Sequence, residues 1–403
     1  MLSTGKICED IAKVVMAYGW ESYIAYGRWA KPGVSYDRCM GNKLDMYMHY
    51  AQHRFFDREG LASRGTTKKL VRWIDEVKPD IIQLHNIHDH YLNYPILFGY
   101  LATLDTPIVW VQHDCWAYTG GCVYHDLYKC DKWREGCKGT CPNKRAIFCN
   151  KSAEQFVLKK ELISKIKSLT FVSVSDWLGD LLMESFHKDR RLMTIHNGID
   201  ISRFRPLTKV EKIKENKERA ESHPDALSSS IPNCRFSILG VAAVWDARKG
   251  LNDFIKLRGI LSAEYKITLV GLTQKQVNKL PAGIRGITRI SSIEEMVQLY
   301  SDSDVFVNST YSDNFPTTNI EALACGTPVI TYKTGGSPEA VDAKTGFVIK
   351  QGDIVSLANT IMYLKDNPFS SADCRKRAQD HFDKDKCFKQ YIKLYNELLN
   401  DNR

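Results

Sequence analysis

The sequence predicts an α/β protein built from two doubly wound parallel-sheet domains in tandem. One observation is that short apolar runs rich in β-branched residues alternate with helical patterns along the chain. The other is the length of 403 residues, which is too great for one ordinary core and favours two domains of about 200 residues each. A cleft between the carboxyl edges of two such sheets is a suitable place to hold two substrates.

The first half of the chain supplies the elements of the N-terminal domain. Ser175 ends the fourth strand pattern and is expected to cap the helix that follows it. We expect this domain to span residues 1–205, with a Cys-rich insertion at 115–149. Strand patterns lie at 22–28, 80–87, 107–114, 169–175 and 192–199, and helical patterns at 65–78, 93–104, 152–167 and 176–186.

The second half repeats the alternation. A polar, Lys/Glu-rich stretch at 207–232 precedes it and marks the domain boundary or an insertion beside it. We expect a C-terminal domain at 206–385, followed by a helix at 386–403 that crosses back to the N-terminal domain. Strand patterns lie at 235–244, 266–272, 304–310, 327–334 and 346–350.

Residues 312–330, with the sequence SDNFPTTNIEALACGTPVI, are predicted to form a loop, a short helix and a strand. Thr318 and Glu321 match the capping-box pattern, and a Gly and Pro stop signal follows, so the helix is expected near 318–325. Asp313 then lies in a loop at the carboxyl end of a strand, where open parallel sheets bind ligands. The alternative is that Glu321 only closes its capping box and Asp313 is a solvated loop acid.

Composition narrows the class of protein. With 26% charged residues the chain reads as a soluble globular protein, and the apolar region 94–112 is interrupted by Pro95, Asp105 and Pro107. No signal peptide pattern is visible, so the twelve cysteines are expected as thiols or metal ligands in a reducing cytoplasm. The net charge of +9 suits nucleotide phosphates or an acidic membrane face. No nucleic-acid-binding motif is present, so nucleic acid is not an expected partner.

Several motifs in order give the chain a family resemblance. Asp313 and Glu321 match an acidic-x7-Glu signature, with Asp where Glu is more usual, and TGGSPEAV and TGFVI follow it. ARKG at 247–250 matches an Arg/Lys element, and HNGID at 196–200 matches the segment that closes a first domain. The chain thus resembles the retaining glycosyltransferases of family 4, whose GT-B fold has two Rossmann-like domains facing a cleft. STGKI, LHNIH and HDCWAYTGGC look like a subgroup common in bacterial surface-polysaccharide gene sets.

The resemblance implies transfer of a sugar from a UDP- or GDP-sugar to a glycan or lipid-linked acceptor, with retained anomeric configuration. It implies a role in capsule, exopolysaccharide or O-antigen synthesis, in the cytoplasm and in peripheral contact with the inner membrane. Its catalytic residues would be His113, Asp313, Arg248 and Lys249. Its donor-binding residues would be Arg248, Lys249, Asp313, Asn314, Phe315, Pro316, Thr317, Thr318 and Glu321.

Arg248 and Lys249 can neutralise the charge that grows on the departing nucleotide diphosphate, as a bidentate fork and a point charge. No metal cofactor is therefore expected for catalysis, and the one Asp-x-Asp match of the second domain, Asp302 and Asp304, precedes a strand and sits at the wrong edge. The simpler readings are an exposed basic turn for Arg248 and Lys249 and a structural role for His113.

The acceptor side is expected to include Gly5, His85, Asn86 and His88, with metal binding by His85, His88 and His90 as an alternative. Family members normally begin with a strand before the STGKI loop. This chain starts almost at that loop, so we expect either that the reading frame begins short or that the first strand is missing, which would leave a central position of the sheet empty.

The cysteines of the 115–149 insertion allow three interpretations. Cys137 and Cys141 have the spacing of a structural zinc site, whereas Cys122 and Cys130 are more widely spaced. A structural zinc bound by Cys122, Cys130, Cys137 and Cys141 is one reading, free buried thiols are the second, and a redox or disulfide role is the third.

Two further functions stay open at this point. A glycoside hydrolase would use Asp313 and Glu321 as its pair of carboxylates, but it would have no use for Arg248 and Lys249. A non-catalytic nucleotide-sugar-binding protein would bind the donor and show no turnover with any acceptor.

Overall fold

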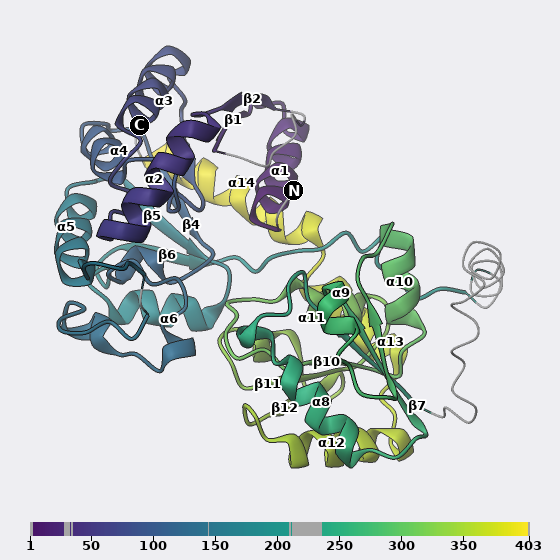
Figure 1. Cartoon of the computed structure of the whole chain (residues 1–403). Helices are drawn as coiled ribbons and strands as arrows, with labels where there is room; N and C mark the ends of the chain where they lie inside the picture. The colour runs from purple at the N-terminus through teal and green to yellow at the C-terminus, as the bar shows by residue number, and fades with distance from the viewer. Residues whose placement is uncertain are drawn as a thin grey trace. The chain divides into compact units, whose positions relative to one another are not determined.

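The computed structural model describes residues 3–27, 33, 35–143, 145–208, 211 and 236–401. These residues form two compact units, Met1–His196 with Cys387–Arg403, and Asn197–Lys386. Each unit has its own parallel β-sheet with helices around it (Figure 1). The predicted fold class is therefore confirmed. Most of the polar stretch at 207–232, which was predicted to mark the boundary, lies outside the described residues.

The first unit is built on a four-stranded parallel sheet in the order β3-β4-β5-β6. Every residue of β4 and β5 is buried, which explains why these strands read as continuous apolar runs. Ser175 caps α6 by accepting a hydrogen bond from the Leu178 amide, as predicted. The elements of the main sheet and its helices are α2 (Lys43–Phe56), α3 (Arg64–Val77), β3 (Ile82–Leu84), α4 (Tyr94–Leu101), β4 (Ile108–Gln112), α5 (Ser152–Ser164), β5 (Leu169–Ser173), α6 (Asp176–Glu184), β6 (Arg191–Thr194) and α14 (Lys384–Asp401).

The start of the chain differs from the prediction. The expected loop at residues 3–5 is the first turn of a helix, α1 (Ser3–Ala17), and Gly5 is exposed there. Ile7 and Ile11 are buried one helical turn apart. An apolar helical face that packs on the unit therefore explains why this segment is a helix and not a loop. The predicted strand at 22–28 forms β1 (Tyr23–Tyr26), which pairs with β2 (Tyr36–Cys39) in a separate two-stranded parallel sheet.

The Cys-rich insertion of the first unit contains three short 3₁₀ turns, η1 (Trp116–Tyr118), η2 (Asp126–Tyr128) and η3 (Lys132–Glu135). Arg145 ties it to the loop after α2 through ion pairs with Asp57 at 2.9 Å and Glu59 at 3.1 Å. All three side chains are buried, and the one guanidinium pairs with both carboxylates, which leaves one formal negative charge in the group.

The second unit contains six parallel strands in the order β12-β11-β10-β7-β8-β9. The chain winds outward from β7 through β8 to β9, and then from β10 on the other side of β7 to β12. The winding direction thus reverses between β7 and β10, and ligands bind at the carboxyl ends of strands at such a point. Its elements are β7 (Phe236–Val241), η5 (Ala247–Lys249), α8 (Leu251–Ile260), β8 (Tyr265–Val270), α9 (Gln274–Val277), β9 (Ile284–Ile287), α10 (Ile293–Ser301), β10 (Val305–Asn308), α11 (Thr317–Ala324), β11 (Val329–Tyr332), η6 (Ser337–Ala340), β12 (Gly346–Ile349), α12 (Ile354–Asp366) and α13 (Ser371–His381).

Helices α8 and α12 pack together against one face of this sheet (Figure 1). Phe254 and Ile361 from the helices meet Ile238 and Val307 from the strands in one buried cluster. Phe306, which alternates with these strand residues, is also fully buried, so both faces are covered. Among the helices of the described part of the chain, none is long and apolar enough to cross a membrane.

Candidate functional site

The basic turn after β7 is held in place by its own backbone. Asp246 caps it by accepting a hydrogen bond from the Arg248 amide at 3.0 Å. Gly250 follows with φ of 71°, and a Cβ there would lie 2.3 Å from the Ser309 carbonyl oxygen, so glycine is required. The Tyr311 amide donates to the Arg248 carbonyl at 2.7 Å. The turn after β7 is thus joined to the segment after β10.

Arg248, Lys249 and Asp313 lie together at the carboxyl ends of these two strands. Lys249 Nζ is 2.6 Å from Asp313 Oδ2, and Arg248 Nη1 is 3.7 Å from the same oxygen. Arg248 also donates to the Ser312 carbonyl at 2.9 Å. The three side chains are 17–19% exposed, so this is not an exposed basic turn. We call these three residues the charge triad, and its formal charges sum to one positive charge.

The predicted capping box is wrong. Helix α11 begins at Thr317, with Pro316 in extended backbone conformation at the N-cap position and no side-chain cap. Because proline can precede a helix directly, the helix starts one residue earlier than predicted and Glu321 lies beyond its first turn. Glu321 instead accepts a hydrogen bond from the Tyr300 hydroxyl of α10 at 3.0 Å. Burial, with the nearby Glu321 carboxylate, raises the pKa of Tyr300 well above 10.

The other predicted donor-binding residues lie in different environments. Asn314, Phe315 and Pro316 are buried, and the Phe315 ring packs against Phe382 at 5.7 Å between ring centres. Thr317 and Thr318 are partly exposed at the start of α11. Because the side chains of these three buried residues point into the unit, only their backbone atoms could contact a ligand.

Two polar residues that organise this edge were missed in the sequence. Asn319 is fully buried, accepts from the Asn308 amide at 2.7 Å and donates to the Ser337 hydroxyl at 3.0 Å, so it joins β10, α11 and η6. Asp253 accepts from the hydroxyls of Tyr311 and Tyr332, each at 2.8 Å. Asn308 lies inside an apolar strand pattern, and buried polar side chains need partners. Its position could therefore have indicated a buried polar contact at this edge.

In the first unit, His85 and His113 follow the neighbouring strands β3 and β4. Their rings stack with centres 5.2 Å apart, and His85 Nδ1 is 2.9 Å from His113 Nε2. Burial lowers the pKa of His85 well below 6.5 and that of His113 to about 4. Both imidazoles are therefore neutral at pH 7, and a hydrogen bond with one donor and one acceptor joins them.

His88 has the opposite charge state. Its Nε2 is 2.7 Å from Asp114 Oδ2. Burial opposes its charge, but the carboxylates of Asp114, Glu59 and Asp89 outweigh burial and raise the pKa of His88 to about 9. Asp114, which the sequence did not single out, therefore keeps His88 an imidazolium at neutral pH. Asn86 takes part through its backbone carbonyl, which accepts from the Tyr91 hydroxyl at 2.7 Å.

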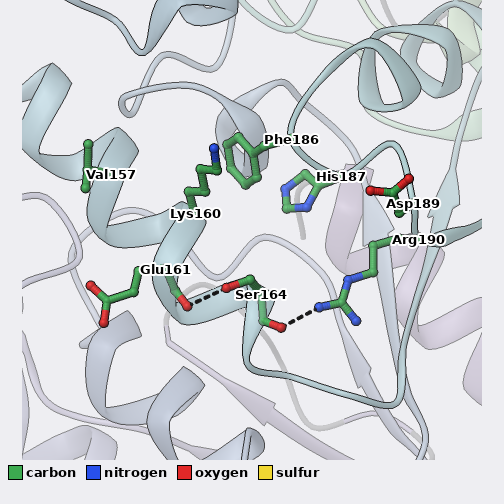
Figure 2. A pocket seen from close by; sticks show the side chains of 8 residues that line it. All are labelled: Val157, Lys160, Glu161, Ser164, Phe186, His187, Asp189 and Arg190. Atoms are coloured by element: carbon green, nitrogen blue, oxygen red, sulfur yellow. Dashed lines mark hydrogen bonds between the residues drawn. The ribbon is translucent and has the colours of Figure 1, made fainter.

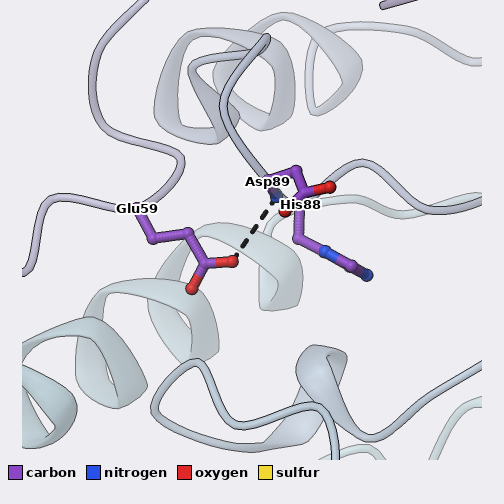
Figure 3. A group of neighbouring side chains, drawn as sticks. All are labelled: Glu59, His88 and Asp89. Carbon is purple, nitrogen blue, oxygen red and sulfur yellow. Dashed lines mark hydrogen bonds between the residues drawn. The ribbon is translucent and has the colours of Figure 1, made fainter. Parts of the chain in front are cut away.

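The metal site considered for His85, His88 and His90 does not form. His85 pairs with His113 and His88 with Asp114, whereas His90 Nε2 lies 2.8 Å from His53 Nδ1. Within the described ranges, His88 instead groups with Glu59 and Asp89, whose ligand atoms lie within 4.8 Å of one another (Figure 3). Because Arg145 already pairs with Glu59, and Asp114 with His88, protein groups satisfy these charges.

The four cysteines predicted to bind zinc line one small space in the insertion. In the part of the chain that the structure describes, their sulfur atoms do not form a group of three within 4.8 Å. The Gly120 amide donates to Cys137 Sγ at 3.1 Å, and burial raises the pKa of Cys122 to about 11. This geometry fits protonated thiols and does not support the predicted zinc site. The residues are Cys122, Cys130, Cys137 and Cys141, all without disulfides.

A surface depression of about 590 Å³ lies elsewhere on the first unit, between α5 and the segment after α6 (Figure 2). None of the predicted site residues lines it. Arg190 donates there to the Ser164 carbonyl at 2.9 Å and to the Ile163 carbonyl at 3.1 Å. Its guanidinium thus satisfies the carbonyls at the end of α5, which is a structural role.

Comparison with known proteins agrees with this architecture. Residues 235–381 match the Glycosyl transferases group 1 family, and residues 19–203 match Glycosyltransferase Family 4. WcaC of Escherichia coli K12, named for colanic acid biosynthesis, is 22% identical over 366 residues, which cover 86% of this chain and 84% of WcaC. CapM of Staphylococcus aureus, named for capsular polysaccharide biosynthesis, is 28% identical over 272 residues, 62% of this chain and 68% of CapM.

Solved structures show the same fold. Sucrose-phosphate synthase of Thermosynechococcus elongatus superposes with a TM-score of 0.70 at 16% identity, over 97% of this chain and 92% of that one. Anabaena Alr3699/HepE in complex with UDP gives 0.64 at 15% identity, over 98% and 96%. The two-sheet architecture and these matches define a GT-B glycosyltransferase that uses a nucleotide-sugar donor. The chain belongs to glycosyltransferase family 4.

Proposed function

We propose that this glycosyltransferase transfers a sugar from a UDP- or GDP-sugar to a saccharide acceptor with retention of anomeric configuration. The charge triad is the observation that supports this most. It consists of two cations and a carboxylate at the point of the second sheet where the winding reverses, and α11 begins at Thr317, four residues after Asp313. A diphosphate bound there would meet a guanidinium, an ammonium and helix amides, which together favour anions.

In the proposed reaction, the bond between the sugar C1 and the diphosphate oxygen breaks, a bond from C1 to an acceptor hydroxyl oxygen forms, and the proton of that hydroxyl passes to the departing diphosphate. Negative charge grows on the departing diphosphate, and Arg248 and Lys249 stabilise it. Preorganised charges of this kind lower a barrier by several kcal/mol without a metal. We therefore propose that catalysis needs no divalent cation.

The remaining roles follow the family resemblance. Asp313 would contact the donor sugar, Glu321 would accept from the ribose hydroxyls, and His113 would contact the donor sugar from the first unit. Support for the role of Glu321 comes from Tyr300, which holds its carboxylate from the buried side. The acceptor side would include Gly5, His85, Asn86 and His88.

For the acceptor we propose a membrane-bound, lipid-linked saccharide in polysaccharide synthesis, reached at the cytoplasmic face. The names of the relatives support the pathway. An exposed surface formed by α2 and the adjoining end of the Cys-rich insertion supports the membrane: Leu44 of α2 is 71% exposed, and Tyr47 of α2 and Phe148 of the insertion are each 70% exposed. The Phe148 ring stacks on Phe55 at 5.8 Å, and exposed Lys43 and Arg54 suit anionic lipid headgroups.

The function is tested by incubating the purified protein with UDP-, GDP- and ADP-sugars and a membrane extract that supplies acceptors. Transfer from a uridine or guanosine donor, with a product whose anomeric configuration matches the donor by NMR, is the expected result. Release of sugar from a glycan without any nucleotide would identify a hydrolase. Donor binding without turnover on any acceptor would identify a non-catalytic protein.

Membrane contact is tested separately by sedimentation with vesicles that contain phosphatidylglycerol. Leu44→Asp and Phe148→Asp should release the protein from these vesicles. Val355→Asp is the matched control, because Val355 is 63% exposed on α12 of the second unit and lies outside the proposed surface. Equal binding of all variants to the vesicles would show that α2 does not contact the membrane.

A further inference from the structure

A chain of hydrogen bonds leads from the C-terminal helix to His113 within the first unit. The Tyr395 hydroxyl of α14 donates to Gln83 Oε1 on β3. Gln83 Nε2 lies 2.8 Å from His85 Nε2, and His85 Nδ1 lies 2.9 Å from His113 Nε2. Tyr395 is 5% exposed. The Trp110 indole donates to the His85 carbonyl at 3.2 Å and holds that residue from its backbone side.

Each partner in this chain fixes the proton of the next. Since the Gln83 amide oxygen accepts from Tyr395, its NH₂ group faces His85, and an amide nitrogen only donates. His85 Nε2 must therefore accept, which leaves the single proton of the neutral ring on Nδ1. That proton is donated to His113 Nε2. His113, which is also neutral, then carries its own proton on Nδ1.

The opposite direction would leave a buried group without a partner. If the Gln83 amide were rotated by half a turn, its NH₂ group would face the Tyr395 oxygen, and the tyrosine proton would need another acceptor. In the described structure the Tyr395 hydroxyl makes no hydrogen bond other than that to Gln83. Burial raises the pKa of Tyr395 well above 10, so the proton stays on the hydroxyl. A buried donor without an acceptor is unfavourable.

We propose that Tyr395, Gln83 and His85 are positioning residues that fix His113 as the Nδ1–H tautomer, which makes it a hydrogen-bond donor and not a base. The inference rests on the proposed contact of His113 with the donor sugar. Its consequence is chemical: Nε2 already accepts from His85 and cannot remove a proton from the acceptor. The single proton of the neutral His113 ring is then on Nδ1.

The tautomer is read directly by ¹⁵N–¹H long-range NMR on the full-length protein labelled at histidine, with His113 assigned by its loss in His113→Gln. The expected spectrum shows a protonated Nδ1 and an unprotonated Nε2 for both His85 and His113. Gln83→Glu puts a carboxylate against His85 Nε2. This substitution should reverse the direction of the hydrogen bonds, so that His113 carries its proton on Nε2. The value of kcat should then fall about 10², while the KM for the donor should stay unchanged.

Tyr395→Phe removes the group that orients the amide and should give both tautomers of His113. Tyr391→Phe is the matched control, because Tyr391 is buried one turn earlier on α14 and takes no part in the chain. Its spectrum should match that of the wild type. A wild-type His113 with its proton on Nε2, or a tautomer unchanged in both Gln83→Glu and Tyr395→Phe, would overturn the proposal. The tautomer is measured without donor or acceptor, so a lack of turnover would count only against the proposed function.

Discussion

Replacement of Asp313 by asparagine separates two roles that this carboxylate could have in the charge triad. Asp313 could hold Lys249 in place, or it could face the donor sugar and leave nucleotide binding to the cations. Its Oδ2 is 2.6 Å from Lys249 Nζ and 3.7 Å from Arg248 Nη1. Asp313→Asn changes the formal charge of the triad from one positive charge to two.

The magnitudes favour unchanged or tighter nucleotide binding. A partly exposed ion pair contributes about 0–1 kcal/mol, so little is lost when Lys249 is released. Repulsion between a carboxylate and a diphosphate at about 4 Å is about 1–4 kcal/mol for effective dielectric constants between 80 and 20. The substitution removes this repulsion. Affinity for UDP or GDP should therefore stay equal or rise, while turnover should fall about 10² because the donor sugar loses its contact.

Isothermal titration calorimetry with UDP and GDP, together with a transfer assay, measures both effects. Lys249→Met should act in the opposite way and weaken the nucleotide about 10- to 150-fold, since a charged hydrogen bond contributes about 1.5–3 kcal/mol. Lys376→Met is the control, because Lys376 pairs with Asp380 at 2.8 Å on an exposed face of α13 in the same unit. If Asp313→Asn bound the nucleotide tenfold more weakly, Asp313 would serve to hold Lys249 and the reasoning above would fail.

Three further predictions concern binding, metal and pH. Glu321→Ala should lose donor affinity and turnover. It should also lower the free energy of unfolding by about 1–3 kcal/mol, because the buried Tyr300 hydroxyl loses its partner. If the variant bound the donor as tightly as the wild type, Glu321 would have a structural role only. Turnover should survive EDTA, and loss of activity that manganese or magnesium restores would contradict this. The His88–Asp114 pair should stabilise the fold fully below pH 6.5, as long as Asp114 stays ionised, and lose this effect as the pH rises through about 9. The difference in unfolding free energy between wild type and His88→Gln should shrink over that range, and a constant difference would show that the pair does not titrate.

The sheets could be predicted from the sequence because their strands are buried on both faces. In β4, β5, β10 and β11 every residue is buried, and such runs are hard to mistake. The short strand β2 could not be predicted in this way. Three of its four residues are exposed, and its partner β1 has no buried residue either.

The charge triad was predictable for a topological reason. Arg248 and Lys249 follow one strand and Asp313 follows its neighbour in the sheet, so their approach needs only the strand order. The capping role of Glu321 was wrongly predicted because a local pattern at Thr318 competed with Pro316, and the proline determined where the helix begins. Local signals at helix ends are therefore weaker than strand order as guides to a site.

The sequence predicted a last helix that returns to the N-terminal domain, but the side-chain contacts of this helix had no sequence signal. Tyr395 and Gln83 are 312 residues apart in the chain, and only the packing of α14 on the first unit brings them together. Asp114 stands next to His113 in sequence, yet its partner is His88 from the neighbouring strand end. Polar pairs of this kind depend on side-chain directions that alternate along a strand, and spacing in the sequence does not determine the partner.

The protonation states of the two histidines bear on the destination of the acceptor proton. With the proposed tautomer, His113 Nε2 accepts from His85, and His88 is already protonated and paired with Asp114, so neither ring would be a base at neutral pH. In the proposed reaction the acceptor proton would pass to an oxygen of the departing diphosphate, which gains basicity as its bond to the sugar breaks. Burial lowers the pKa of His113 to about 4, while the neighbouring carboxylates raise that of His88 to about 9. The pH profile of kcat should therefore show no histidine ionisation between these values. An ionisation near 6.5 that disappears in His113→Gln or in His88→Gln would identify that residue as the base.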